Sequence, residues 1–215
     1  MREIKWISLL YVAILCIPFI VDAQSKKIDS STFYKALRDG EDASDKVSHR
    51  RTIVEDRYEN GKVVNSATSL SERIPPDKSR SVHSYYLGRG LEQSTVVQIG
   101  SLYYCRQGVR PWKKSNQYCG QMTISGEPSD SIVDYNTDVV DLNGAQVRLY
   151  SSAGSYHGAE GILRSFEDKI WINERGLIIR RESTTASEER GVKYGSKTTT
   201  TFEYNPIGLK IQAPI

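Results

Sequence analysis

Residues 132–151 read IVDYNTDVVDLNGAQVRLYS, and this stretch decides the fold class. Its two β-rich runs, Ile132–Leu142 and Ala145–Ser151, are separated by the dipeptide Asn143-Gly144. Asn-Gly suits the left-handed backbone of a two-residue hairpin turn. The stretch therefore predicts two adjacent antiparallel strands.

Similar runs and turns fill most of the chain on both sides of this hairpin. Asn60-Gly61 and Glu174-Arg175-Gly176 are further turn signals between β-rich runs. Ile207–Ala213 alternates apolar and other residues, which predicts a half-buried edge or closing strand. We expect about ten strands, joined mostly by short turns, in one large antiparallel sheet that is curled or closed to hide its edges. The other predicted strands are Arg51–Glu59, Lys62–Ile74, Ser79–Leu87, Val96–Ile99, Leu102–Cys105, Leu163–Ile172, Leu177–Thr185 and Thr198–Tyr204.

One short helix is predicted near the start of this region. Ser30-Ser31-Thr32 offers N-capping side chains, and Phe33, Ala36 and Leu37 form an apolar stripe at helical spacing. Gly40 is expected to end the helix. The chain is therefore predicted to be mainly β, with few helices.

The first 23 residues differ from the rest. Arg2 and Lys5 precede a largely apolar run, Trp6–Val21, that contains no charge and is shorter than the roughly 20 residues needed to span a bilayer. Ala23 ends a suitable cleavage site. We interpret residues 1–23 as a secretory signal peptide and residues 24–215 as a single domain, periplasmic or secreted, with no stable membrane span after cleavage.

The net charge and the cysteines limit the kinds of ligand and bond that we expect in this protein. A net charge of +3 without a long basic run argues against nucleic acid as a ligand. The basic pairs Lys113-Lys114 and Arg180-Arg181 are short and are expected to be solvated. Cys105 and Cys119 remain after cleavage, and in an exported protein we expect them to form one disulfide. A metal site or a redox pair is the weaker alternative for these two residues.

Signatures of catalysis are missing from the sequence. His49, His83 and His157 have no metal-ligand spacing, no Gly-x-Ser-x-Gly occurs, and Gly88-Arg89-Gly90 lacks the strand–helix frame of a dinucleotide site. Paired carboxylates such as Asp134 with Asp138 are expected to be solvated. We therefore expect neither an enzyme nor a bound metal or cofactor.

A concave apolar surface is the remaining feature of the sequence that could carry a function. A strongly curved sheet with few helices has a concave face, and an apolar, incompletely covered face would bind hydrophobic ligands. A plain packed core is the alternative interpretation of the same residues. The candidate cavity residues are Leu102, Tyr104, Ile170, Ile172, Leu177, Ile179, Phe202 and Tyr204.

Five local patterns, in order along residues 24–215, resemble the superfamily of LolA-type lipoprotein carriers and the related LppX/LprG-like envelope proteins. The first is a helix after the signal peptide, and the others are strand–turn patterns. They are Phe33–Leu37; Val96–Tyr104 followed by Pro111–Lys114; Val139–Ala145; Lys169–Ile172 followed by Gly176–Arg180; and Phe202–Pro206 followed by Leu209, Ile211 and Ala213-Pro214.

The resemblance implies an unclosed β-barrel whose apolar cavity accepts acyl chains. It implies a carrier of lipids, or of the acyl chains of lipoproteins, in a bacterial envelope. An envelope sensor of the same fold, with a protein partner, is the alternative. The readable helices are fewer than in that superfamily, and the Cys105–Cys119 loop is not part of its general pattern.

Overall fold

The computed structural model describes residues 25–87, 90–119, 132–158 and 161–214. The predicted signal peptide lies outside the described residues. Within them, no helix is long and apolar enough to cross a membrane.

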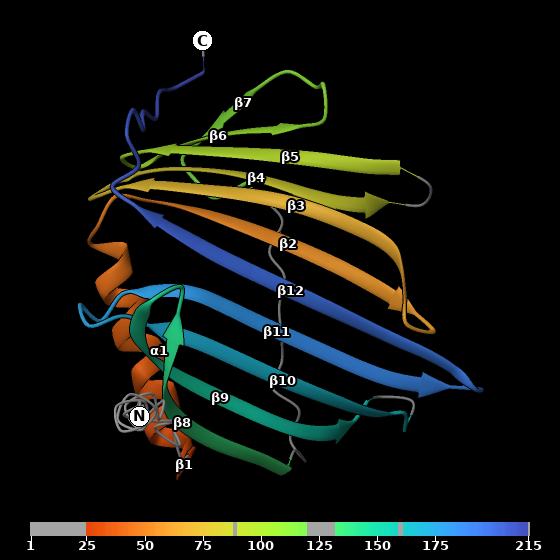
Figure 1. Ribbon diagram of the computed structural model, residues 1–215. Helices are drawn as coiled ribbons and strands as arrows, with labels where there is room; N and C mark the ends of the chain where they lie inside the picture. Colours follow the sequence, from red (N-terminus) through yellow and green to blue (C-terminus); the bar gives the residue numbers. More distant parts are fainter. Residues whose placement is uncertain (1–24, 88–89, 120–131, 159–160, 215) are drawn as a thin grey trace, which may run out of the picture.

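The described residues form one antiparallel sheet of twelve strands and one helix (Figure 1). The sheet order is β1-β8-β9-β10-β11-β12-β2-β3-β4-β5-β6-β7, so the sheet is unclosed, with β1 and β7 at its two ends. This confirms the prediction of a mainly β chain with a large antiparallel sheet. The elements are β1 (Lys26–Ile28), α1 (Ser30–Asp45), β2 (His49–Glu59), β3 (Lys62–Ile74), β4 (Lys78–Leu87), β5 (Gly90–Ile99), β6 (Leu102–Gln107), β7 (Lys113–Ser115), β8 (Ile132–Leu142), β9 (Ala145–His157), β10 (Leu163–Ile172), β11 (Ile178–Glu189) and β12 (Val192–Tyr204).

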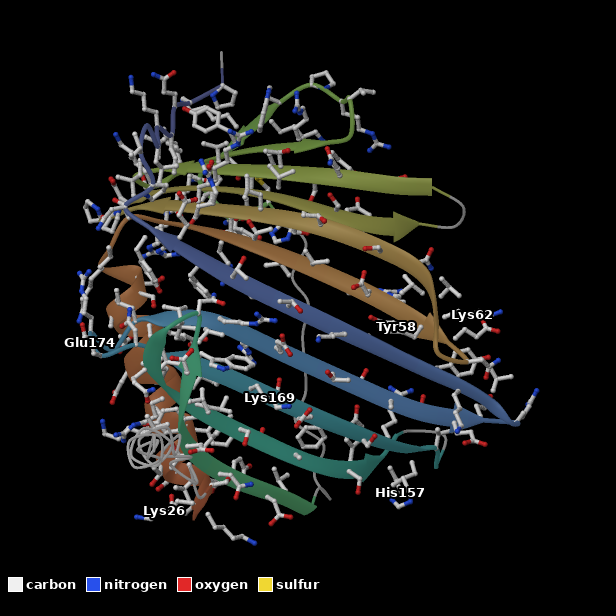
Figure 2. The ribbon with its side chains drawn as sticks, in the orientation of Figure 1. Lys26, Tyr58, Lys62, His157, Lys169 and Glu174 are labelled. Carbon is white, nitrogen blue, oxygen red and sulfur yellow. A yellow bond between two sulfur atoms is a disulfide. The ribbon has the colours of Figure 1, made fainter. Side chains whose placement is uncertain are left out.

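The predicted turns connect long hairpins. Asn60 and Asn143 have positive φ angles of 50° and 57°, and each is followed by a glycine with positive φ. These residues tolerate the left-handed conformation that two-residue hairpin turns require. Tyr58 lies near the turn that joins β2 to β3, and Glu174 lies in the turn that follows β10. Figure 2 shows these two residues at opposite ends of the strands.

Helix α1 packs on one face of the sheet, which we call the helix face. Phe33 lies against Ile170, Ile172 and Ile178, and these four residues form a buried core cluster. Partly buried apolar side chains around it complete the packing. They are Ile28, Ala36, Leu37, Tyr135, Tyr150 and Phe202.

The opposite, outer face carries a row of alternating charges across four neighbouring strands. Glu203, Arg50, Glu72 and Arg80 are successive cross-strand partners on β12, β2, β3 and β4. Arg50 contacts Glu72 at 3.0 Å and Glu203 at 3.2 Å, and Arg80 lies 3.9 Å from Glu72. Because the Glu72 side chain is only 6% exposed, these cations compensate a buried carboxylate.

Two predictions about α1 are wrong. The helix is capped by Asp29, whose side chain accepts a hydrogen bond of 2.7 Å from the Thr32 backbone N–H, and not by the three residues that follow. The helix also continues through Gly40 to Asp45. Gly40 is buried, and a Cβ there would lie 2.8 Å from Cγ1 of Ile178. The glycine therefore allows close helix–sheet packing instead of ending the helix.

The prediction of a closing strand at Ile207–Ala213 is also wrong. The positive φ of Asn205 ends β12, and the positive φ of Gly208 accompanies a turn in which the Leu209 N–H donates to the Pro206 carbonyl at 3.3 Å. Ile207 is fully exposed whereas Ile211 is buried, so the alternating apolar residues do not share one face.

Candidate functional site

The main apolar cluster of the helix face lies beneath α1. Ile170 is 1% exposed and Ile178 is 2% exposed, and Phe33 lies over them. The rings of Phe33 and Tyr135 have centroids 5.3 Å apart, which extends the cluster onto β8. We call the sheet residues of this cluster the apolar patch; they are Tyr135, Tyr150, Ile170, Ile172, Ile178 and Phe202.

Outside the area beneath α1 the helix face is mostly polar. The cross-strand row that begins at Ile170 continues through Arg181, Thr200, Ile53 and Ser69. The next row contains Asp168, Ser183, Thr198, Glu55 and Ala67. Since residues paired across strands share a face, the sheet offers an acyl chain an apolar surface mainly where α1 now lies.

A closed cycle of hydrogen bonds fixes the C-terminal end of α1. The Tyr204 hydroxyl donates to the Ile178 carbonyl at 2.6 Å, and the Ser44 hydroxyl, 2.6 Å away, donates to the Tyr204 oxygen. The Ile178 N–H in turn donates to the Ser44 oxygen at 3.3 Å. The last turns of α1, the start of β11 and the end of β12 are thereby joined.

Ion pairs reinforce the same end of the helix. Asp45 lies 3.5 Å from Arg73, and Glu41 lies 4.0 Å from Arg181. All four side chains are at least a third exposed, so each pair contributes little by itself. The N-terminal half of α1 is attached differently, because Phe33 is its single fully buried side chain.

Two ionisable side chains of β2 and β4 are half-buried on the polar part of this face. Burial lowers the pKa of the Arg51 guanidinium, an effect that Asp45 and Glu41 oppose. Burial, and then the positive charge of Arg51, lower the pKa of His83 below its usual value of 6.5. In the described part of the chain, Nε of Arg51 has no hydrogen-bond partner.

The other histidines have different surroundings. His49 is buried, and its Nδ1 lies 3.1 Å from the Ser44 carbonyl and 3.0 Å from that of Val47. Its ring also contacts the rings of Phe202 and Tyr204, whose centroids lie 5.9 and 5.8 Å away. His157 is exposed at the end of β9. His49 therefore supports the packing beneath the end of α1.

The structure brings only part of the predicted cavity set together. Ile170, Ile172 and Phe202 belong to the apolar patch, and Tyr204 lies beside it in the hydrogen-bonded cycle. Leu177 is buried just before β11, and Ile179 lies half-buried where the register of β10 and β11 shifts. That these residues contact a lipid stays a prediction.

Leu102 and Tyr104 lie elsewhere. Tyr104 is paired with Val97, and Leu102 with Ile99, in the row positions of the outer face. Tyr135, Tyr150 and Ile178, in contrast, belong to the patch but were absent from the predicted set. The alternation of β8 and β9 around Asn143-Gly144 is the signal that identifies the two tyrosines as neighbours.

No family model and no curated protein matches this chain. Solved structures similar to it include a LolA superfamily protein from Nitrosomonas europaea, at 7% identity and a TM-score of 0.28, with 79% of this chain and 90% of that chain covered. A DUF1329 family protein from Desulfovibrio piger has 11% identity and a TM-score of 0.30, with 84% and 94% covered. The first is named for the superfamily that the sequence motifs resemble. Both TM-scores lie below 0.5, so neither structure indicates a function for this chain.

Proposed function

We propose that this protein is an exported binder or carrier of acyl chains, and that α1 is a displaceable cover over the apolar patch. The observation that carries the proposal is the unequal attachment of α1. Its C-terminal end is held by the cycle through Ser44 and Tyr204, whereas its N-terminal half rests on Phe33 with half-buried Ala36 and Leu37 and is tied to the sheet through the short strand β1, which pairs with β8.

The energetics favour exchange of the cover for a ligand. Each methylene group transferred from water to an apolar surface contributes about 0.8 kcal/mol. A chain of roughly ten methylenes therefore offers more than the burial of the Phe33 side chain, which contributes about 1.5–3 kcal/mol. Release of the three-residue strand β1 from β8, together with rotation of α1 about its hydrogen-bonded end, would expose Ile170 and Ile172 while the helix stays attached.

A disulfide that locks α1 to the sheet tests this proposal. Gly40 and Ile178 are in close contact, so Gly40→Cys combined with Ile178→Cys places two thiols within bonding reach. We expect the oxidised double variant to take up no fluorescent fatty acid and the reduced form to regain uptake. Unmodified protein treated with the same reductant controls for the native disulfide. Equal uptake by the locked and unlocked forms would contradict the role of α1.

An envelope interaction module that binds a protein partner is the second candidate. The polarity of the helix face beyond α1 favours it, because Ser and Thr side chains with interspersed charges suit a hydrated protein surface better than an acyl chain. Native mass spectrometry separates the two candidates. Bound lipid in protein purified from an envelope supports the carrier, whereas the bare polypeptide mass, together with no fatty-acid uptake, supports the module.

A further inference from the structure

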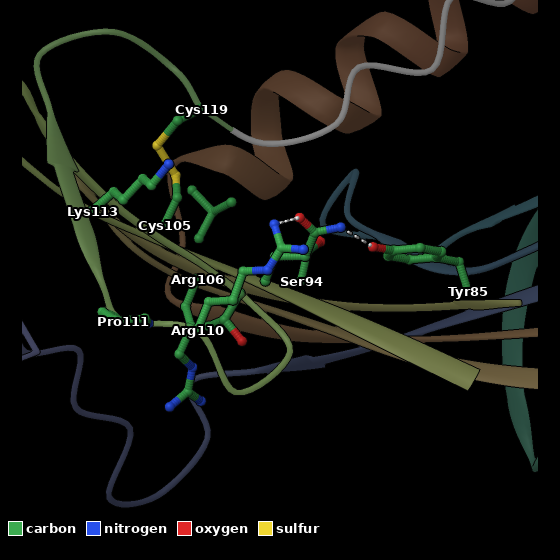
Figure 3. A pocket seen from close by; sticks show the side chains of 11 residues that line it. Tyr85, Ser94, Cys105, Arg106, Arg110, Pro111, Lys113 and Cys119 are labelled. Carbon is green, nitrogen blue, oxygen red and sulfur yellow. Dashed lines mark hydrogen bonds between the residues drawn. A yellow bond between two sulfur atoms is a disulfide. The ribbon is translucent and has the colours of Figure 1, made fainter. Parts of the chain in front are cut away.

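A cleft of about 350 Å³ lies between the disulfide-closed loop and the strands β4 to β6, away from the apolar patch (Figure 3). We call it the loop cleft, and the residues that matter to its chemistry are Ser94, Cys105, Gln107, Arg110, Lys113 and Cys119. The predicted bridge between Cys105 and Cys119 is formed. Because Lys113 of β7 pairs with Cys105 of β6, the bridge holds the loop against the sheet edge.

The disulfide-closed loop carries positive charges that no acidic residue of the loop neutralises. Residues 105–119 contain Arg106, Arg110, Lys113 and Lys114 and no Asp or Glu, in a chain whose net charge is +3. Among the residues that the structure describes, none of these four forms an ion pair. The Arg106 guanidinium lies 4.8 Å from the centre of the Trp112 ring, which orients it by a cation–π contact.

Neutral hydrogen bonds hold Arg110 at the cleft. Its guanidinium donates to the Gln107 side-chain oxygen at 3.4 Å, and the Gln107 amide donates to the Tyr85 hydroxyl at 3.2 Å (Figure 3). Tyr85 donates in turn to Glu92 at 3.4 Å. A guanidinium has five N–H donors, so this neutral contact positions Arg110 and leaves most of its donors and its whole charge for another acceptor.

The cleft also contains a buried hydroxyl without a partner. Oγ of Ser94 is inaccessible to solvent and makes no hydrogen bond within the described part of the chain. Buried hydroxyl groups normally have a hydrogen-bond partner. Ser94 therefore marks a wall of the cleft where a small movement of its side chain would bring the hydroxyl to a ligand oxygen.

We propose that the loop cleft binds a phosphate group. Arg110 provides a forked donor, Lys113 a point charge and Ser94 a hydroxyl, which together suit an anion with several oxygens better than a two-oxygen carboxylate. One water molecule takes about 30 Å³ of liquid, so the cleft accommodates a phosphate with part of the group esterified to it. The phosphate belongs either to a soluble ester or to a phospholipid headgroup.

This inference is independent of the proposed acyl-chain site. The patch lies on β8 to β12 and the cleft on β4 to β6, with β2 and β3 between them in the sheet. Loss of phosphate binding with intact fatty-acid uptake, or the reverse, therefore identifies which proposal has failed.

Calorimetric titration with inorganic phosphate and glycerol 3-phosphate tests the site, with vesicle flotation on phosphatidylglycerol and phosphatidylcholine as the second arm. We expect saturable binding that Arg110→Gln with Lys113→Gln weakens at least tenfold and that Ser94→Ala weakens several-fold. Lys62→Gln with Lys193→Gln is the matched control, because it removes two exposed cations near hairpin turns. Figure 2 shows Lys62 at the end of its hairpin.

The two arms distinguish the source of the phosphate. Binding of the soluble esters with equal flotation on both lipids indicates a soluble ligand, whereas selective flotation on phosphatidylglycerol indicates a headgroup. The proposal is overturned if no probe binds, or if the Arg110 and Lys113 variant binds as the control does. Melting curves and the exposed single variant Lys113→Gln show whether a loss of binding reflects misfolding.

Discussion

The hydroxyl oxygens of Ser44 and Tyr204 lie 2.6 Å apart, although 160 positions separate the two residues in the sequence. This contact links the last turns of the helix to the last residue of β12. It also anchors the carbonyl and the N–H of Ile178. The cover and the floor of the apolar patch thus share one hydrogen-bonded joint.

Tyr204→Phe breaks this joint while keeping the ring. We expect the free energy of unfolding to fall by roughly 1–3 kcal/mol, because the Ile178 carbonyl loses its donor and Ser44 its acceptor. Amide hydrogen exchange in α1 should accelerate more than exchange in β2 or β3. Tyr103→Phe is the matched control, and an equal effect of the two changes would argue against the joint.

Gly40→Ala should destabilise the protein, although alanine is the better helix former by roughly 1 kcal/mol. The added Cβ would lie 2.8 Å from Cγ1 of Ile178 and 3.3 Å from Cδ1 of Ile172, and both side chains are buried. We expect a lower midpoint in urea unfolding, with Arg38→Ala on the exposed side of α1 near neutral. A stabilised Gly40→Ala variant would show that the helix does not press on the sheet.

Acidification should destabilise the protein through His83. Since burial and Arg51 lower its folded-state pKa below 6.5, the unfolded chain binds a proton more readily than the folded chain. This contribution to stability is complete above pH 6.5 and is lost as the pH falls from 6.5 through the folded pKa. Melting temperatures measured between pH 7.5 and pH 5 should fall less steeply for His83→Gln than for the unmodified protein, and parallel curves would refute the assignment.

Removal of the disulfide should cost stability and leave the helix attached. In the chain-entropy model, opening a loop of 15 residues costs about 3 kcal/mol. Cys105→Ser with Cys119→Ser should lower the urea midpoint accordingly. Fatty-acid uptake should persist, because the bridge lies on β6 and its loop, whereas phosphate binding at the loop cleft should weaken.

Glu72→Gln should lower the melting temperature by several degrees. The change removes the buried negative charge that lies between Arg50 and Arg80. Glu203→Gln alters an exposed member of the same row, with a side chain that is 58% exposed, and should have a smaller effect. Similar shifts for both variants would mean that burial of Glu72 has no energetic role.

The sheet was predictable from the sequence because its turns are encoded locally. Asn60-Gly61 and Asn143-Gly144 adopt the turn conformation that these residues favour, so the flanking strands pair as expected. The prediction of a closing strand was wrong because the alternation of apolar residues does not reveal that the chain changes direction at Asn205 and Gly208. The Arg190-Gly191 turn was missed because its flanking residues are polar.

The candidate site was less predictable because it depends on contacts between distant segments. Gly40 resembles a helix end in sequence, and only its contact with Ile178 explains why a glycine lies inside the helix. Ser44 lies beyond that apparent end and so had no predicted role. Ile170 and Ile172 of β10 were predicted as candidate cavity residues, but the sequence does not indicate that one helix already covers them.

The strand order has a consequence for the synthesis of the protein. β12 pairs with β2 at the middle of the sheet, through eleven residue pairs from Tyr194–Glu59 to Tyr204–His49. The segment β2 to β7 can pair within itself as soon as it emerges, and so can β8 to β12. The seam between these halves, and the joint that fixes α1, require residues within the last 22 of the chain. A nascent chain therefore holds two unjoined half-sheets until its C-terminal strand is complete, and truncation before Val192 should leave both halves with an additional exposed edge.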